Sequence, residues 1–206
     1  MSNAIRIHGF PLSGHSHRVE LFANLAGINH EMIVVDLANG EHKKQPFLAL
    51  NPAGKVPVIE DGDVVVADSN AILVYLAREY APDWLPADAA GEAQVQRFLS
   101  LAANEIANGP AAARLVTVFG ADLDADKAKA TAAYVFDLLE GELRGRAWLV
   151  GDRPTIADVA IYSYTAHAPE GNVSLEPYAN IRAFLKRVEA LPGFVAMPAT
   201  PVGLAA

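Results

Sequence analysis

The sequence contains no cysteine, which excludes disulfide bridges, thiolate metal ligands and a cysteine nucleophile. No apolar run reaches the roughly 18 residues of a membrane-spanning helix. The N-terminal residues also lack the basic segment and hydrophobic block of an export signal. We therefore expect no membrane and a cytoplasmic location.

Positive charge is scarce as well, because the net charge is −8 and lysine and arginine form no cluster. Binding of nucleic acid needs several cations that neutralise phosphates, so nucleic acid is not expected as a partner. Any anionic ligand must be held by local cations against an unfavourable global field.

Apolar residues are abundant, and their spacing predicts a first domain of mixed structure. With 52% apolar and 19% charged residues, the 206-residue chain can bury a large core in one or two domains. Residues 4–10 alternate like a strand, 16–27 have helical spacing that ends at Gly27, and 30–37 resemble a buried strand. This β-α-β order predicts that the two strands are parallel.

The next segment predicts a short helix and a hairpin. Residues 41–50 are expected to form the helix, and two β-rich runs flank Asp61-Gly62, a strong hairpin signal. An amphipathic helix then ends near Tyr80. The first domain is therefore predicted to have the order β-α-β-α-β-β-α.

The rest of the chain is predicted to be helical. Residues 81–90 are rich in proline and small residues, as expected of a linker. Gly109-Pro110 is expected to break or kink the second long helix of the chain. Helical spacing recurs over 92–108, about 125–145, 156–168 and 178–191. The predicted fold class is α+β, with one domain at 1–80 and an all-α domain at 91–206.

Pro57 stands between Val56 and Val58, where a strand begins. Proline donates no hydrogen bond to a sheet, and X-Pro is the bond type whose cis form costs little. A cis bond would leave the Val56 N–H and C=O free to pair with an extended, peptide-like ligand. The alternative is a trans proline at the start of a strand.

Asp68 and Ser69 precede an amphipathic helix, so either side chain can be its N-cap. The unpaired N–H groups of a helix N-terminus also bind carboxylates. Ser69 could present its hydroxyl and N–H to a carboxylate while Asp68 receives an ammonium group, which suits an α-amino acid. The alternative is capping alone.

The loop at 9–17 follows the first strand, where ligands of open α/β sheets gather. It carries hydroxyl and imidazole side chains: Ser13, His15, Ser16 and His17. The G-x-S-x-G nucleophile elbow is missing, so a serine here is expected to act as a hydrogen-bond donor. Two histidines without carboxylates give little support for a metal, and none is expected.

Thr155 and Asp158 have the spacing of a capping box at the start of an apolar helix. This motif predicts a structural role in the second domain.

Together, "NPAGKVP", "DSNAI", the serine after "PL" and the Thr-x-x-Asp box resemble the soluble glutathione transferases. The resemblance covers essentially the whole chain, and the serine is most similar to that of the theta-like and related bacterial branches. It implies a thioredoxin-like first domain that binds glutathione and a helical second domain that contributes the pocket for an electrophile. It also implies a homodimer and a role in detoxification.

The resemblance implies a role for each matching residue. Ser13 matches the serine that donates to the glutathione sulfur, and Val56 the residue whose backbone pairs with the cysteinyl unit. Asp68 and Ser69 match the pair that receives the γ-glutamyl end. The glycine carboxylate is expected near His42, Lys43 and Lys55.

Some assignments stay open in the sequence. His15 or Ser16 can share the role of Ser13. Arg18 is expected in a structural ion pair. The second substrate is expected between the domains, against Phe10, Leu12 and the helix at 92–119, with polar contacts from Asn104, Asn108 and Arg114.

The leading functional prediction is transfer of glutathione to a small hydrophobic electrophile. The alternatives are reduction of disulfides or peroxides, dehalogenation, or a noncatalytic binding module. Without cysteine, a mixed disulfide between protein and glutathione is excluded.

Overall fold

The structure is a computed structural model that describes residues 4–206. The strands are β1 (Ile5–Gly9), β2 (His30–Val34), β3 (Val58–Asp61) and β4 (Val64–Ala67). The α-helices are α1 (Gly14–Leu25), α2 (Phe47–Leu50), α3 (Ser69–Tyr80), α4 (Ala89–Leu101), α5 (Ala112–Phe119), α6 (Ala125–Glu142), α7 (Ile156–Ala166) and α8 (Ala179–Glu189). A π-helical segment, Ala102–Ala111, joins α4 to α5, and short 3-10 turns lie at Glu41–Lys43, Pro82–Trp84, Ala168–Gly171 and Gly203–Ala205.

The chain forms two compact units. The first contains the residues up to Asp83 together with Leu191–Pro198, and the second contains Trp84–Ala190 and Ala199–Ala206. The first unit is a sheet with helices and the second is helical, so the predicted α+β class is confirmed.

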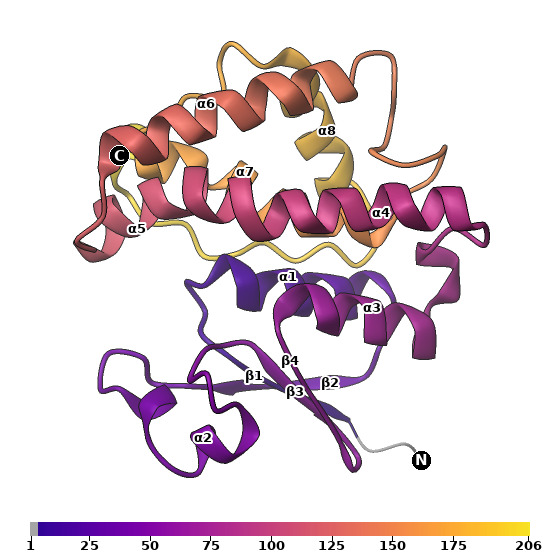
Figure 1. The fold of residues 1–206 in the computed structure, drawn as a ribbon, viewed down its shortest axis with the longest axis vertical. Coiled ribbons are helices and arrows are strands. Elements are labelled where there is room, and N and C mark those ends of the chain that lie inside the picture. The colour runs from indigo at the N-terminus through magenta and orange to yellow at the C-terminus, as the bar shows by residue number, and fades with distance from the viewer. Residues whose placement is uncertain (1–3) are drawn as a thin grey trace. The chain divides into compact units, whose positions relative to one another are not determined.

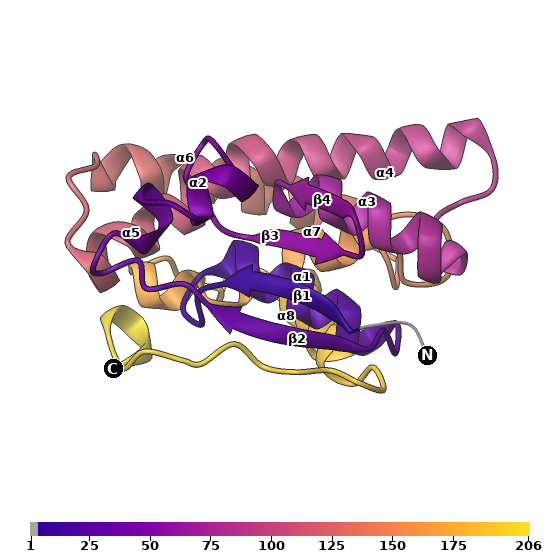
Figure 2. The same cartoon turned by 90° about the horizontal axis from the view of Figure 1, so that it is seen from below.

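The sheet of the first unit has the order β2-β1-β3-β4 (Figures 1 and 2). β1 and β2 are parallel, as the β-α-β pattern predicts, and β3 runs antiparallel to both β1 and β4. α1 and α3 cover one face of the sheet, and α2 lies on the other (Figure 1). This arrangement places the carboxyl end of β1 and the N-termini of α1 and α3 in one unit.

Apolar side chains pack on both faces of the sheet, because successive side chains of a strand point to opposite faces. Ile7 on β1 is paired with Ile59 on β3, and both are fully buried. Val58, which precedes Ile59 on β3, lies in a separate cluster with Val35 and Phe47 on the α2 side. The residues around Pro57 are therefore anchored to the sheet at their C-terminal end.

The hairpin prediction is confirmed with a shift of one residue. Asp61 is the last residue of β3 and pairs with Val64, so the two-residue loop is Gly62-Asp63. Gly62 has φ 58°, a left-handed conformation that glycine adopts at little cost.

The prediction of a buried second strand is wrong in one respect. β2 is an edge strand, and its last residue, Val34, is 60% exposed. The apolar run of this segment does not distinguish a central strand from an edge strand, because both carry Ile and Val.

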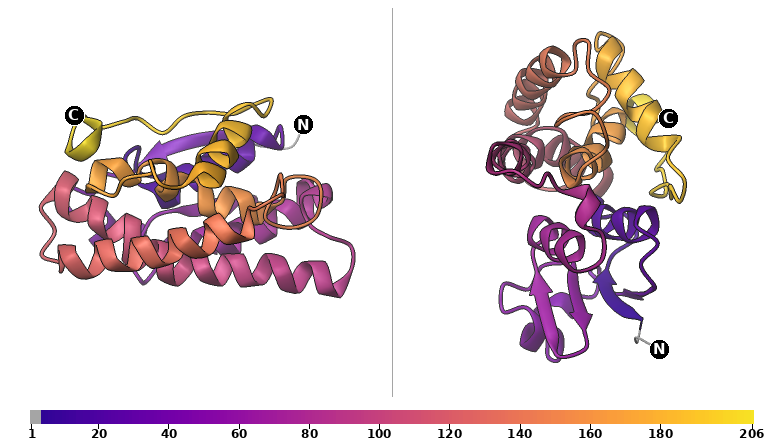
Figure 3. Two further views of the ribbon diagram at one scale, coloured as in Figure 1. Left: turned by 90° about the horizontal axis from the view of Figure 1, so that it is seen from above. Right: turned by 90° about the vertical axis from the view of Figure 1, so that its right-hand side faces the viewer.

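In the helical unit, α7 is the central helix (Figure 3). Its residues from Ile156 to Thr165 are all buried, and it packs on α4 and α8. Of the predicted break or kink at Gly109-Pro110, the break is absent, because the chain remains helical there with a π-helical segment. Pro110, which has no N–H to donate, lies within the π-helical turns. Gly109 packs closely on the backbone of Ala132 in α6.

No helix within the described part of the chain is long and apolar enough to cross a membrane.

Candidate functional site

Ser13 lies at the N-terminus of α1, just beyond the carboxyl end of β1. It is the N-cap, and its Oγ accepts a hydrogen bond from the Ser16 N–H at 3.3 Å. A hydroxyl has two lone pairs and one proton, so this bond leaves the proton free to be donated. The side chain is partly exposed. Ser13 therefore presents a hydroxyl donor beside the positive end of a helix.

Ser16, the other hydroxyl near this site, has a structural role. It is 1% exposed, and its Oγ accepts the Phe10 N–H at 3.1 Å. Gly9 approaches it so closely that a Cβ there would lie 3.0 Å from Ser16 Cβ. Ser16 thus closes the turn between β1 and α1.

Asp68 is the N-cap of α3, which decides between the two candidates for this cap. Its Oδ1 accepts the N–H groups of Asn70 and Ala71 at 2.9 and 3.0 Å. Its backbone has φ 75°, an uncommon conformation that often marks a functional position. Ser69 is the first residue of α3 and is buried.

Arg18 contacts Ser69 and Asn70, two hydrogen-bond partners that the sequence did not predict. Its side chain is fully buried, and Nη1 donates to Ser69 Oγ and to Asn70 Oδ1, each at 2.8 Å. This bond brings a cation from α1 to the N-terminus of α3. Positive charge therefore gathers where the carboxylate of an amino acid was predicted to bind.

His15 lies between these groups. Its Nδ1 is 3.3 Å from Ser69 Oγ. Burial of the ring, followed by the positive charges of Arg18 and Lys55, lowers the pKa of His15 to about 3. The imidazole is therefore neutral near pH 7. The positive charge of Lys55 is the smallest of the three causes that lower the pKa of His15, and it acts locally although the protein as a whole is anionic.

The peptide bond between Val56 and Pro57 is cis, and a second cis bond, Gln45-Pro46, was not predicted. Among residues 4–206, no backbone hydrogen bond uses the N–H or the C=O of Val56. Asn51 Nδ2 donates to the carbonyl oxygen of Lys55 at 2.8 Å and holds the preceding turn in place. The Val56 backbone is thus available for pairing with a ligand.

His42 and Lys43 lie against this turn. Lys43 Nζ donates to the Gly54 carbonyl oxygen at 2.8 Å. Gly54 has φ 55°, and a Cβ there would lie 2.7 Å from the His42 carbonyl oxygen. The Nδ1 atom of His42 is buried and has no hydrogen-bond partner among residues 4–206.

These contacts connect the predicted site residues within the first unit. Ser69 contacts His15 near Ser13, the charge of Lys55 acts on His15, and Lys43 contacts the turn before Lys55. The Arg18–Ser69–His15 chain was not predicted. Its one signal in the sequence is the i, i+3 spacing of His15 and Arg18, which places both on one face of α1.

The expected role of Arg114 in a substrate pocket is wrong. Arg114 is 1% exposed, and its Nε is 2.7 Å from Glu170 Oε2. Glu170 also accepts hydrogen bonds from His167 and Thr200. Burial raises the pKa of Glu170, but the hydrogen bonds from Thr200, His167 and Arg114 lower it to about 2. Arg114 therefore stabilises the helical unit.

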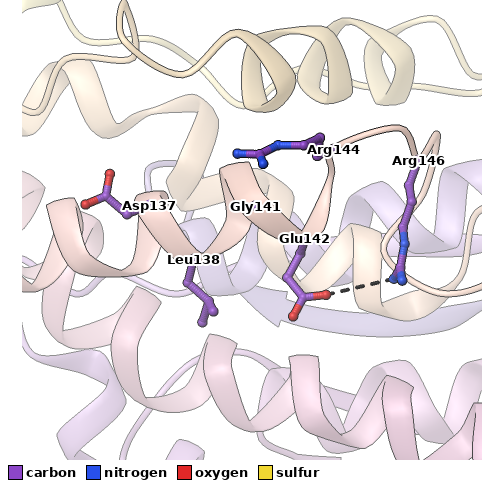
Figure 4. A pocket seen from close by; sticks show the side chains of 6 residues that line it. All are labelled: Asp137, Leu138, Gly141, Glu142, Arg144 and Arg146. Carbon is purple, nitrogen blue, oxygen red and sulfur yellow. Dashed lines mark ion pairs between the residues drawn. The ribbon is translucent and has the colours of Figure 1, made fainter.

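Asn104 and Asn108 are exposed and hydrogen-bonded to each other at 2.9 Å, from Asn108 Nδ2 to Asn104 Oδ1. The helical unit also has a surface hollow of about 450 Å³ at the end of α6 (Figure 4). Glu142 lies there between Arg97 and Arg146, at 2.9 and 3.9 Å. None of the predicted glutathione-binding residues lines this hollow.

His17 is buried, and its Nε2 is 2.9 Å from the carbonyl oxygen of Val195, so it holds the returning segment Leu191–Pro198 against α1. No group of three or more potential metal ligands occurs within residues 4–206.

Comparison with protein families gives matches in both units. Residues 12–79 match the family described as "Glutathione S-transferase, N-terminal domain". Residues 112–192 match "Glutathione S-transferase, C-terminal domain". Together these matches span most of the chain.

Curated relatives match over nearly the full length. The chain is 33% identical to glutathione S-transferase 3 of Zea mays, over 92% of this chain and 91% of that protein. It is 35% identical to maleylpyruvate isomerase of a Ralstonia species, over 87% and 89%. It is 34% identical to glutathione S-transferase theta-2 of Mus musculus, over 88% and 79%.

Solved structures agree with these relatives. A glutathione S-transferase from Pseudomonas fluorescens has a TM-score of 0.90 and 31% identity, covering 95% of this chain and 99% of that one. A glutathione transferase homologue from Drosophila mojavensis with bound glutathione has a TM-score of 0.84 and 26% identity, covering 93% and 90%.

Proposed function

Because the chain belongs to the glutathione S-transferase family, we propose that it binds glutathione in its first unit, stabilises the thiolate through Ser13 and transfers it to a small hydrophobic electrophile. The observation that carries this proposal is the cluster at the N-termini of α1 and α3. A hydroxyl donor, two helix N-termini and the cation Arg18 lie there, and the charge of Lys55 acts on His15 in the same cluster.

The proposed ligand contacts follow from the groups that each segment offers. The backbone of Val56 pairs with the cysteinyl unit, because its N–H and C=O have no backbone partner among residues 4–206. Asp68 and Ser69 hold the γ-glutamyl end. Lys55 holds the glycine carboxylate, with His42 and Lys43 beside it.

Thiolate stabilisation is the chemical step that Ser13 supports. A free thiol with a pKa near 8.5 is only about 3% ionised at pH 7. Lowering this pKa by about two units stabilises the thiolate by roughly 2.7 kcal/mol. A hydrogen bond to a charged group contributes about 1.5–3 kcal/mol, and a helix N-terminus adds about 0.3–1 kcal/mol. A neutral serine hydroxyl therefore suffices, because the ligand's sulfur makes the attack.

The test is the pH profile of conjugation with 1-chloro-2,4-dinitrobenzene. Ser13→Ala should move the rising limb to higher pH by one to two units, while glutathione affinity changes by a few-fold at most. Ser13→Thr keeps the hydroxyl and should retain most of the activity at pH 7. An unchanged profile in Ser13→Ala would exclude the proposed role of Ser13.

A second candidate activity is isomerisation, favoured by the 35% identity to the protein named maleylpyruvate isomerase. Reduction of disulfides or peroxides and dehalogenation use the same glutathione site. Turnover of maleylpyruvate, a hydroperoxide, a disulfide and a chloro-nitrobenzene by one preparation separates these activities. If the protein were a noncatalytic module, calorimetry would show no glutathione binding at millimolar concentration.

We further propose that the protein is a cytoplasmic homodimer, as the family resemblance implies. Light scattering on the eluting protein should give twice the chain mass of 21.9 kDa, whereas a single-chain mass excludes the dimer. Cell fractionation tests the location.

A further inference from the structure

The chain of hydrogen bonds from Arg18 through Ser69 to His15 is more than a structural support, because it ends at a titratable group. His15 and Arg18 are three residues apart on α1, and Ser69 begins α3. Arg18 is fully buried and Ser69 is 4% exposed. The bond between Arg18 and Ser69, which connects the two helix N-termini, is therefore shielded from water, and His15 at the end of the chain is half-buried.

The direction of these bonds follows from the donors and acceptors available. A guanidinium only donates, so Ser69 Oγ is the acceptor from Arg18 Nη1 at 2.8 Å. Among residues 4–206, His15 Nδ1 at 3.3 Å is the acceptor in contact with the Ser69 hydroxyl. A buried hydroxyl proton needs an acceptor. The network thus assigns the Ser69 proton to His15 Nδ1, and the ring's own proton to Nε2.

Neutrality of His15 depends on the same surroundings. Two charged groups that act on it are Arg18, from its own helix, and Lys55, from the turn before β3. Together with burial, these cations keep the imidazole unprotonated, with a pKa of about 3. Before the ligand binds, the imidazole is therefore neutral and only accepts a hydrogen bond at Nδ1.

A carboxylate at Ser69 changes each of these conditions. It is a stronger acceptor than a neutral imidazole, because hydrogen bonds with an ionised partner are roughly twice as strong. The existing bond to His15 is also at the long end of the range for hydrogen bonds. In addition, the two carboxylates of glutathione offset the charges of Arg18 and Lys55, and so remove part of the repulsion that opposes protonation of His15.

We propose that the Ser69 hydroxyl changes its partner from His15 to the ligand's carboxylate on binding, and that His15 takes up a proton from solvent in exchange. The Ser69 proton stays on Ser69, and the new proton goes to the vacated Nδ1. His15 is then a positioning residue that acts through Ser69 and couples binding to pH. This inference rests on the proposed glutathione site.

The experiment is titration calorimetry with S-methylglutathione at about pH 6, in two buffers with different heats of ionisation. This ligand has no titratable thiol, so its sulfur releases no proton. Free carboxyl groups, with pKa values near 4, are largely ionised at this pH. If His15 returns to the ordinary histidine pKa of about 6.5, it takes up roughly three-quarters of a proton.

Two variants isolate His15. In His15→Asn, the amide oxygen can still accept from Ser69 but does not titrate, so binding should persist without proton uptake. His30→Asn removes a histidine that contacts Asn24 and the Ile28 carbonyl oxygen instead, and proton uptake should match that of the wild type.

The outcomes separate this inference from the proposed function. Binding by the wild type without proton uptake, or equal uptake in His15→Asn, would overturn the inference and leave the glutathione site standing. No binding of S-methylglutathione by the wild type at millimolar concentration would overturn both.

Discussion

Replacement of Asp158 by alanine should destabilise the helical unit more than any other single cap substitution. The carboxylate is 1% exposed and completes the capping box of α7. Its Oδ1 accepts the Leu149 N–H at 2.9 Å, and its Oδ2 accepts the N–H and the hydroxyl of Thr155 at 2.8 and 3.2 Å. Asp158 therefore joins α7 to the preceding segment.

The magnitude follows from the groups that alanine leaves without a partner. Each buried N–H that loses its acceptor costs about 1–3 kcal/mol, and Asp158→Ala leaves two, at Leu149 and Thr155. We expect a loss of about 3–5 kcal/mol in the free energy of unfolding. Asp124→Ala is the matched control, because Asp124 caps α6 with one bond to the Lys127 N–H at 2.9 Å but is exposed. It should cost about 1 kcal/mol.

The pH dependence of Asp158 has a definite sign. Burial raises its pKa to about 6, above the value in the unfolded chain. Between about pH 4 and pH 6 the folded state then holds more protons than the unfolded state, so this group's contribution to stability is lost as the pH rises. Relative to Asp158→Asn, which does not titrate, the wild type should lose up to roughly 3 kcal/mol over this range.

Urea unfolding followed by tryptophan fluorescence measures these effects in the right unit, because Trp84 and Trp148 both lie in it. Equal losses in Asp158→Ala and Asp124→Ala would contradict the reasoning, since burial would then make no difference. A pH-independent difference between wild type and Asp158→Asn would contradict the sign of the titration.

The remaining predictions concern Glu170, Gly54 and Lys55. Glu170→Gln should lower the free energy of unfolding by about 3–5 kcal/mol at pH 7, whereas the surface change Glu142→Gln should lower it by less than about 1 kcal/mol. The difference between the two variants should shrink as the pH falls from about 4.5 towards 2, because Glu170 becomes protonated there. Urea unfolding across that pH range measures this difference. A difference that stays constant with pH would contradict the pairing of Glu170. Gly54→Ala should weaken glutathione binding in calorimetry at least tenfold, because its Cβ would collide with the His42 carbonyl oxygen. The control Gly62→Ala, with an equally left-handed φ and nothing within 4 Å of the added Cβ, should leave the affinity unchanged. Equal glutathione affinities in the two variants would refute the predicted effect of the contact. Lys55→Met should raise the glutathione KM several-fold and weaken its salt dependence, and an unchanged salt dependence would exclude Lys55 from the site.

Much of the fold was predictable, because the spacing of apolar residues and the cap residues indicate the same helices and strands. Gly27 follows the C-cap of α1 with φ 65°, and Thr155 and Asp158 form the capping box, as the sequence indicates. The course of Leu191–Pro198 was not predictable. This segment follows α8 yet belongs to the first unit, held in part by the bond between His17 and Val195, and local patterns carry no information about such distant contacts.

The candidate site residues could be chosen from sequence motifs, but the contacts that they make could not. Motifs indicated Ser13, Val56, Asp68 and Ser69 as candidate site residues, whereas no motif indicated the hydrogen bond from Arg18 to Ser69. Arg114 was expected at a pocket, and its burial against Glu170 shows why charge alone misleads. Whether a cation faces a ligand or a buried carboxylate depends on tertiary contacts that composition does not contain.

The most direct test of the central claim is the pKa of the glutathione thiol in the complex, measured by the ultraviolet absorbance of the thiolate. The wild type should show a pKa near 6.5, about two units below that of the free thiol, and Ser13→Ala should return it by one unit or more. An equal pKa in wild type and Ser13→Ala would contradict the account.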